Sequence, residues 1–365
     1  MKKLILFLFS FTLVVGCADL DLQPTDMIAE DAVKKDPKLV EAFLTKIYAN
    51  AVFEPNEVGG IPQQNRLTDA VVGGEYTLMA PWQGAVAASA NIPTSSGSHG
   101  LINRWHYGNI RSANEIIQIL AEASFDPATV AVQTAEAKFL RAWMYLDMAK
   151  RYGGMPIEDT PKSIDAGVDE LMIPRSTLKE TYDFIIADLD AGIADLPGVA
   201  LNGKATKWAA HALKSRAALY AARIAKYHPQ SSNGLTSIPA GDAASYYQMA
   251  HASASAVIDG GKHPLPRGGG TYQKTFGEIF YQKTNSEHIF VEEYDLSLGK
   301  THTWSGYAMP DGFKAGWGSN MHPYIHSDAR FEHKDGSAGD KYHNLFNNST
   351  FFDLEEVIYL SLIHI

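Results

Sequence analysis

The sequence predicts a mainly α-helical protein, an irregular tetratricopeptide-like helical-repeat scaffold with long loop excursions and little β-structure. Three observations predict this fold class. Apolar residues recur at spacings of three and four in several segments between residues 38 and 261, which puts them on one face of each helix. Small residues alternate with large ones on these faces, so that a second helix can pack closely. The segments follow one another as helix–turn–helix pairs, but no regular period of about 34 residues survives and the connecting loops differ in length.

Length, composition and charge limit the function classes. The chain of 365 residues is long enough for a large core, as one domain or two. Its 45% apolar and 20% charged residues are typical of an ordinary globular protein. The formal charge of −10, together with the lack of any lysine- or arginine-rich run, argues against nucleic acid as a partner. The single cysteine excludes an internal disulfide.

Residues 1–16 have the pattern of a secretory signal peptide. A basic start at residues 1–3 is followed by an apolar run over residues 4–15 and by Gly16, which precedes the only cysteine, Cys17. The run is too short to span a bilayer, which needs about 20 apolar residues. Residues 14–17 (VVGC) resemble a bacterial lipobox, which implies cleavage before Cys17 and its lipidation. We therefore expect residues 17–37 to form a lipidated tether that anchors the protein to a membrane; the alternative is an ordinary signal peptide with an incidental cysteine.

The scaffold, expected over residues 38–261, begins with a helix from about Lys38 to Val52. Helical periodicity then disappears over residues 53–103, where paired glycines and a Ser/Gly/Pro-rich run predict a long loop insertion. Loops of this length inside a compact domain are usually functional. A second helix is expected from about Leu101 to Ala123, with a stop around residues 125–127.

The densest helical pattern lies in residues 135–157. One packing face carries alternating small and large residues: Ala135, Phe139, Ala142, Leu146 and Ala149. Arg141, Lys150 and Arg151 lie off this face, and the last two suit the negative C-terminal end of the helix dipole. Gly153-Gly154 can take the cap conformation with positive φ, and Pro156 prevents the helix from resuming.

Three further helices complete the predicted scaffold. Thr177 and Glu180 have the spacing of a capping box, which predicts a helix over residues 178–196. An alanine-rich helix follows over 206–228, and the last helix covers 243–258.

The character of the chain changes after the scaffold. Glycine, aromatic and polar residues dominate residues 262–359, which predicts a loop-rich aromatic region. The alternating stretch 288–294 (HIFVEEY) is a candidate strand. Residues 360–365 (LSLIHI) read like the translation of a transposon-type sequencing adaptor, so we expect a non-native tail; an ordinary apolar strand is the alternative.

Six groups of residues, in a constant order behind the lipobox, resemble the SusD/RagB family. They are Trp105 and Tyr107 with Ile110, Ala113 and Asn114; residues 135–142 (AEAKFLRA); residues 151–156 (RYGGMP); Arg175, Ser176 and Thr177 with Ile186, Asp188, Leu189, Leu196 and Pro197; residues 204–207 (KATK) with 212–216 (ALKSR); and Ser286 and Glu287 with Ile289 and Phe290. The family continues past this length with an Arg/Glu-rich C-terminal segment that is not found here. We therefore expect a C-terminally truncated fragment with an incomplete ligand-binding region.

The resemblance implies a function as well as a fold. Members of the family are lipoproteins on the outer surface of Bacteroidetes that capture nutrients for a paired transporter. By resemblance, this chain is expected to lie in the outer membrane, lipid-anchored and facing the cell exterior, and to bind a poly- or oligosaccharide or similar nutrient. It would deliver this ligand to a SusC-like TonB-dependent transporter, without catalysis and without a cofactor. Two other functions stay open: a surface glycan hydrolase, and a scaffold subunit that binds only the transporter.

The ligand-binding residues are expected on the loops. Sugar rings stack their C–H faces on Trp and Tyr, while Asp, Asn and Arg bond the hydroxyls. The candidates are Arg66, Asp69, Trp82, Trp304, Tyr307 and Trp317. Asp69 holds the acidic position that is usual for this loop in the family. For each aromatic ring the alternative is packing against the core or its own loop. Trp105 and Trp143 have core spacing on helices, so we expect both to be packed.

No motif indicates a metal site or a catalytic centre. His322 and His326 have helical spacing, but Pro323 follows the first histidine and no HExxH sequence occurs. Glycines 268–270 lack the Lys-Ser/Thr of a phosphate loop, and there is no GxSxG elbow. Glycoside hydrolysis needs two carboxylates at a defined separation, which the sequence alone does not give. We predict no catalytic residue, no metal ligand and no cofactor.

Overall fold

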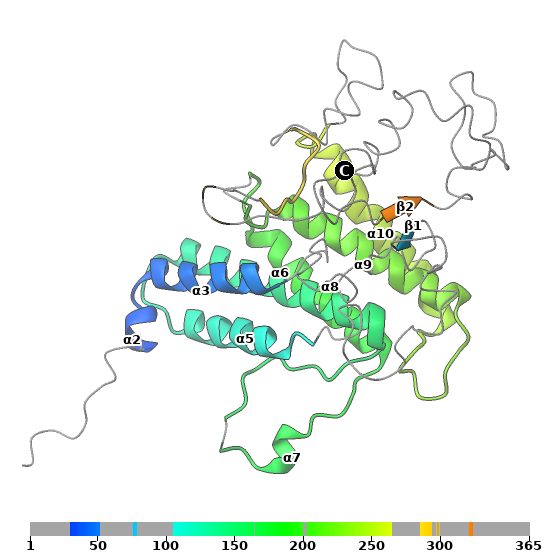
Figure 1. Cartoon of the computed structure of the whole chain (residues 1–365), viewed down its shortest axis with the longest axis horizontal. Coiled ribbons are helices and arrows are strands. Elements are labelled where there is room, and N and C mark those ends of the chain that lie inside the picture. Colours follow the sequence, from blue (N-terminus) through cyan, green and yellow to red (C-terminus); the bar gives the residue numbers. More distant parts are fainter. Residues whose placement is uncertain are drawn as a thin grey trace, which may run out of the picture.

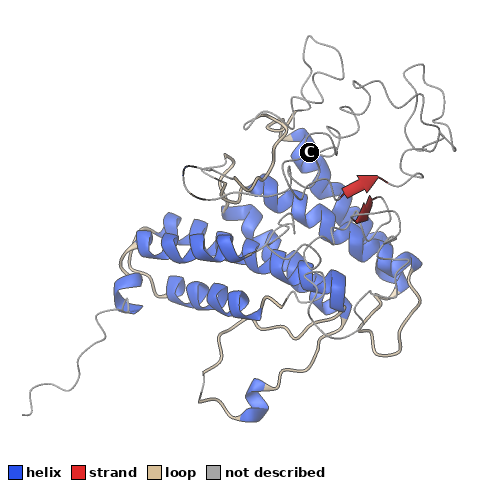
Figure 2. Cartoon of the chain, in the orientation of Figure 1, coloured by secondary structure: helices blue, strands red, loops and turns tan. Residues whose placement is uncertain are grey.

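Helices that follow one another in the chain pack side by side in the protein, as a computed structural model shows (Figures 1 and 2). The structure describes residues 30–51, 76–78, 105–163, 165–199, 203–264, 285–293, 297, 299 and 321–323. The predicted mainly α-helical class is confirmed. The helices and their bounds are α2 (Glu30–Val33), α3 (Pro37–Asn50), α5 (Tyr107–Ala121), α6 (Pro127–Tyr152), α7 (Val168–Leu171), α8 (Leu178–Asp195), α9 (Lys207–Tyr227), the 3₁₀ turn η2 (Ala240–Asp242) and α10 (Ala243–Asp259).

Helix α6 lies at the centre of this arrangement. Helices α3 and α5 pack on it from one side, α8 packs on it from another, and α9 and α10 continue the stack beyond α8 (Figure 1). Because neighbours surround it, almost every residue from Gln133 to Ala149 is buried. Arg141, which was expected only to lie off the small-residue face, is 5% exposed. Its charge is buried because partners on α5 and α8 bind it.

Local signals set the helix ends. Asp126 caps α6 by accepting a hydrogen bond from the Thr129 amide at 3.0 Å, and Pro127 occupies the first turn, where a missing N–H costs nothing. The capping box of α8 is confirmed, since the Glu180 amide donates to Thr177 Oγ1 and the Thr177 amide donates to Glu180 Oε2. Gly153 ends α6 with φ of +81°, and a Cβ there would lie 2.3 Å from the Leu235 carbonyl oxygen. Only glycine fits this close approach.

The described β-structure is one short ladder. Strand β1 (Tyr76–Leu78) pairs antiparallel with β2 (Met321–Pro323), with Thr77 opposite His322. This agrees with the prediction of little β-structure. The candidate strand at 288–294 was wrong for its described residues 288–293, which form bends and irregular chain. Ile289 and Phe290 both pack on the core, whereas successive side chains of a strand point to opposite faces.

Candidate functional site

The six predicted ligand-binding residues lie outside the residues that the structure describes, as does Cys17. The six are Arg66, Asp69, Trp82, Trp304, Tyr307 and Trp317. Their roles stay predictions. A site built from described residues must therefore come from the helical scaffold and its short connections.

Two aromatic rings stack where α5 begins and α6 ends. Trp105 lies just before α5, and Tyr152 is the last residue of α6. The ring centroids are 4.3 Å apart and the ring planes differ by 7°, so the rings are almost parallel. Trp105 is 57% exposed, so more than half of its surface contacts solvent although Tyr152 covers one face of the indole. We call Trp105 and Tyr152 together the ring stack.

The position of Trp105 corrects an expectation. Trp105 does not lie on a helix and does not pack in the core, because α5 begins only at Tyr107 and not near Leu101. Trp143, in contrast, is 6% exposed within α6, as expected. One sequence signal could have separated the two tryptophans. Gly108 and Asn109, poor helix formers, indicate that the helix is just starting there, so Trp105 is free of the helical face.

A buried charge cluster holds the chain next to Trp105. The ring of His106 lies in the interior, with Nε2 2.9 Å from Asp147 Oδ2. The other carboxylate oxygen of Asp147 accepts a hydrogen bond from Arg151 at 2.5 Å. The His106 amide also points to the sulfur of Met148, at 3.5 Å. The backbone beside Trp105 is thus bound to the last turns of α6, which carry Tyr152.

Tyr107 and Arg175 bind the backbone around the end of α6. The Tyr107 hydroxyl donates to the Pro156 carbonyl oxygen at 2.9 Å, and its ring centroid lies 6.3 Å from that of Trp105. Burial raises the pKa of the Tyr107 phenol, and the Arg175 guanidinium works against that shift. Tyr107 therefore keeps its proton and donates throughout the physiological range. Arg175 donates to the carbonyl oxygens of Tyr152 at 2.5 Å and of Gly154 at 2.8 Å.

A second buried network fixes the loop after α6. Arg141 donates through Nε and Nη2 to the two carboxylate oxygens of Asp188, each at 2.7 Å, in a bidentate pair. Its Nη1 donates to Asn114 Oδ1 at 2.6 Å and to the Asp159 carbonyl oxygen at 3.1 Å. Asn114 in turn donates to the Glu158 carbonyl oxygen at 2.9 Å. The sequence pattern did not indicate this network, although Arg141, Asn114 and Asp188 all belong to the residue groups that resemble the SusD/RagB family.

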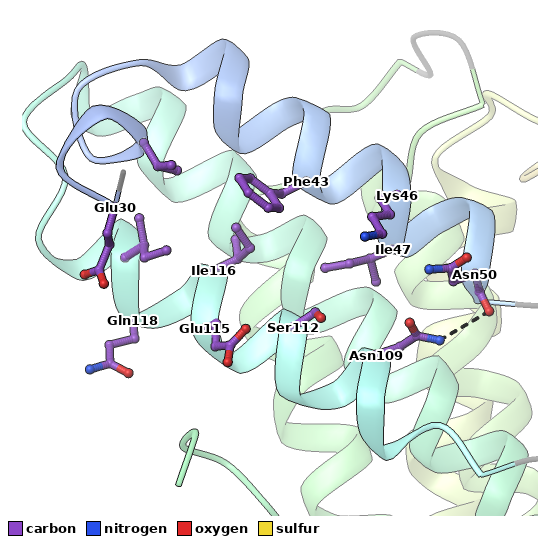
Figure 3. Close-up of a pocket in the computed structure, with 12 residues that line it drawn as sticks. Glu30, Phe43, Lys46, Ile47, Asn50, Asn109, Ser112, Glu115, Ile116 and Gln118 are labelled. Atoms are coloured by element: carbon purple, nitrogen blue, oxygen red, sulfur yellow. Dashed lines mark hydrogen bonds between the residues drawn. The ribbon is translucent and has the colours of Figure 1, made fainter. Parts of the chain in front are cut away.

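A groove between α3 and α5 is a second candidate site (Figure 3). It has a volume of about 590 Å³, within the usual range for small-ligand sites. Its floor is apolar, with Ile47 and Ile116 buried, while Phe43 is 40% exposed. Polar side chains of α2, α3 and α5 line the rest: Glu30, Lys46, Asn50, Asn109, Ser112, Glu115 and Gln118.

The polar groups of the groove mostly bind other parts of the scaffold. Asn109 donates across the groove to the Asn50 carbonyl oxygen at 3.4 Å, as the dashed line in Figure 3 shows. Glu30 pairs with Lys34, and Glu115 pairs with Arg111 on its own helix. Phe43 is the one aromatic residue among the lining residues. The groove therefore offers less flat surface for a sugar ring than the ring stack does.

A buried acid, Glu136, lies in the first half of α6. It is 3% exposed, and its Oε2 has no hydrogen-bond partner among the described residues. The nearest described cation is Lys204, whose Nζ lies 3.9 Å from Oε1 of Glu136 and 2.8 Å from Glu41. Burial raises the pKa of Glu136 to about 7. A raised pKa often marks a general acid, but a carboxyl enclosed in this way cannot reach a glycosidic oxygen.

Within the described ranges, no group of three or more His, Cys, Asp or Glu side chains is arranged to hold a metal ion. None of the helices described there is both long and apolar enough to cross a bilayer.

Comparison with known proteins identifies the family. Residues 20–219 match the family model of SusD-like proteins described as "Starch-binding associating with outer membrane". The match covers more than half of the chain. The chain belongs to this SusD-like family.

Individual SusD-like proteins are similar to this chain in sequence or in fold. A SusD-like protein of Bacteroides ovatus is 24% identical over 230 residues, which are 61% of this chain and 39% of the relative. The crystal structure of a SusD-like protein from Bacteroides fragilis matches with a TM-score of 0.62 and 23% identity, over 92% of this chain and 60% of that one. A second B. fragilis structure, of a SusD-like carbohydrate binding protein, matches with a TM-score of 0.64 and 16% identity, over 86% and 56%. The chain spans about two fifths of the length of the curated relatives it matches.

The SusD-like assignment gives the buried network a context. Arg141, Asn114 and Asp188 lie on three different helices, so their mutual bonds fix the relative positions of α5, α6 and α8. All three residues fall within the range that matches the family model. The network is thus part of the scaffold, and the ring stack lies at its edge.

Proposed function

We propose that this SusD-like chain belongs to a lipoprotein of the outer membrane that faces the cell exterior and binds a glycan or similar nutrient. It delivers this ligand to a SusC-like TonB-dependent transporter and does not itself catalyse a reaction. The observation that carries the proposal is the match of residues 20–219 to a family described as starch-binding and associated with the outer membrane. The B. fragilis carbohydrate binding protein of similar fold supports the ligand class.

Each part of the chain has a role in this proposal. The helices α3 to α10 form the scaffold that positions the loops. Arg66, Asp69, Trp82, Trp304, Tyr307 and Trp317 contact the ligand from these loops. Cys17 carries the lipid that anchors the mature protein. The scaffold also offers the transporter a large rigid surface.

Affinity electrophoresis tests glycan binding. The soluble form that begins at Ala18 is run through native gels that contain starch, laminarin, xyloglucan or no polysaccharide. We expect retardation in at least one polysaccharide gel, and weaker retardation for the double variant Trp304→Ala, Trp317→Ala. A chain that migrates alike in every gel contradicts the proposed ligand class. Retardation that the double variant leaves unchanged contradicts only the roles of these two residues.

The same polysaccharides separate the other two functions. Release of reducing ends from any of them by the purified chain would identify a hydrolase. Co-purification with the transporter barrel, in the absence of retardation in any gel, would identify a scaffold subunit.

Fractionation of cells tests the anchor. The full precursor is expected in the outer-membrane fraction, where protease added to whole cells can digest it. The Cys17→Ser variant loses the lipid attachment site and is expected to leave this fraction. If the variant stays in the outer membrane as completely as the unmodified protein, lipidation at Cys17 is not the anchor.

A further inference from the structure

We propose that the ring stack is a sugar-stacking subsite, in which the open face of Trp105 binds one pyranose ring of the glycan. The inference rests on the proposed function and assigns to it a site apart from the six predicted loop residues. It is carried by the geometry of Trp105, Tyr152, Tyr107 and Arg175.

The shape of the surface fits a pyranose ring. An indole presents a flat apolar face, and the C–H face of a sugar covers such a face without leaving hydroxyl groups unsatisfied. Tyr152 lies parallel under one face of Trp105 at 4.3 Å, so the ligand has a single face to use. The ring of Tyr107 lies 6.3 Å from that of Trp105 at an angle of 21°, so a third aromatic ring lies close to the stack.

A hydrogen-bond donor lies at the backbone of the stack. Arg175 is exposed and donates to the backbone carbonyl oxygen of Tyr152, so its guanidinium is bound to a residue that carries one of the two rings. A guanidinium has five N–H donors, and the bonds to Tyr152 and Gly154 use two of them. Further donors of the same fork can bind hydroxyl groups at the edge of the sugar ring.

The stack is rigid before any ligand binds. The bonds of His106 to Asp147, of Asp147 to Arg151 and of Tyr107 to Pro156 hold the backbone that follows Trp105 against the end of α6. Binding therefore orders few groups that are mobile in the free protein, which reduces the entropic cost of association. A described ring at another helix end has less support. Tyr227 at the end of α9 is 67% exposed, and its described ring contact is with the flexible side chain of Lys226.

Calorimetric titration with defined oligosaccharides tests the subsite. Maltoheptaose, laminarihexaose and a xyloglucan heptasaccharide are titrated into the form that begins at Ala18 and into three variants. For the probe that binds most tightly, Trp105→Ala is expected to weaken binding about tenfold, by loss of one stacking contact. Trp105→Phe keeps a smaller flat ring and is expected to weaken binding by about threefold, half of the tenfold change on a logarithmic scale. Tyr227→Ala is the matched control and should bind as the wild type does.

The outcomes distinguish the subsite from the proposed function. If the wild type binds a probe and Trp105→Ala binds it within about twofold as well, the subsite is overturned while glycan binding stands. A wild type that binds none of the three probes contradicts both. Far-ultraviolet circular dichroism, which reports the helices, shows whether each variant is folded; because Trp105 is largely exposed, this spectrum should be unchanged. A loss of affinity shared equally by Tyr227→Ala would indicate a non-specific effect and also overturn the subsite.

Discussion

Helix α6 supports two regions whose buried polar groups differ in how well they are satisfied. In its second half, Asp147 has a partner on each oxygen, and Arg141 makes bonds to Asp188, Asn114 and a carbonyl oxygen. In its first half, Glu136 has a cation no nearer than 3.9 Å among the described residues. The satisfied half lies next to the ring stack, and the other half packs near α3.

The difference shows what a flat binding surface requires. Fully satisfied buried networks hold a unique geometry, whereas a half-satisfied acid makes its region depend on its protonation state. The rings of Trp105 and Tyr152 lie next to a fully satisfied network, that of Asp147 with His106 and Arg151. The groove of Figure 3 lies on the α3 side, which is near the half-satisfied acid Glu136. The comparison predicts a graded set of effects.

Replacement of Arg141 should have the largest effect. Arg141→Met leaves the Asp188 carboxylate and the Asn114 amide oxygen in the interior without their donor. Breaking a buried pair in this way costs about 3–5 kcal/mol of the free energy of unfolding. Urea denaturation followed by circular dichroism measures the loss.

A surface pair provides the control. Lys179 and Asp183 form an ion pair on α8, with side chains 38% and 46% exposed. Lys179→Met should change the free energy of unfolding by less than about 0.5 kcal/mol. If Arg141→Met costs no more than this control, the second half of α6 is not stabilised by its network, and the contrast between the two halves is lost.

Removal of the Glu136 charge should have the next largest effect, and it depends on pH. The pKa is near 4.5 in an unfolded chain and about 7 in the folded protein, so the folded state binds the proton more tightly between these values. The contribution of Glu136 to stability therefore falls as pH rises from about 4.5 to about 7, and the penalty of the buried charge is complete above that. Glu136→Gln removes the penalty. Relative to wild type it should gain about 2–4 kcal/mol between these two pH values.

The free energies of unfolding of wild type and variant, measured at pH 4.5, 6 and 8, give this difference directly. Glu115→Gln, at a side chain on α5 that is 43% exposed, serves as the surface control for the loss of one carboxylate. A Glu136→Gln difference that stays constant with pH would show that this acid ionises as an exposed one does.

Loss of the Tyr107 hydroxyl should have the smallest effect on stability. Tyr107→Phe removes the donor to the Pro156 carbonyl oxygen, which also accepts a hydrogen bond from Tyr145 at 3.3 Å. Because this oxygen keeps a partner, the loss should be about 1 kcal/mol of unfolding free energy. Tyr227→Phe, at an exposed ring, should be neutral. A loss of several kcal/mol for Tyr107→Phe would mean that one bond, and not the network, holds the loop.

Local signals allowed most of the helical scaffold to be predicted. The spacing of apolar residues identified the long helices, and the Thr177–Glu180 box and the glycine at 153 set two of their ends correctly. Helix α6 begins earlier than its apolar stripe indicated, because Pro127 starts this helix after the Asp126 cap. The four-residue helices α2 and α7 carry too few residues to show a period.

The candidate site depended on contacts that no local pattern contains. Arg141 is buried because Asp188, 47 residues away along the chain, meets it across the packing of α6 and α8. Trp105 stacks on a ring at the end of another helix, Tyr152, and the residues next to Trp105 in the sequence do not indicate this contact. The six loop residues predicted from their chemistry lie outside the described part of the chain, so their roles stay predictions.

Nuclear magnetic resonance of the tryptophan side chains tests most directly whether a sugar binds at Trp105. The chain has six tryptophans, and each indole N–H gives one resonance in a ¹⁵N-labelled, deuterated sample. The Trp105 signal is assigned by its absence in Trp105→Phe, and laminarihexaose or another probe that binds in calorimetry is then added. We expect the Trp105 resonance to shift in proportion to saturation while that of the buried Trp143 stays in place. A Trp105 resonance that does not move, while other tryptophan signals do, would contradict this expectation.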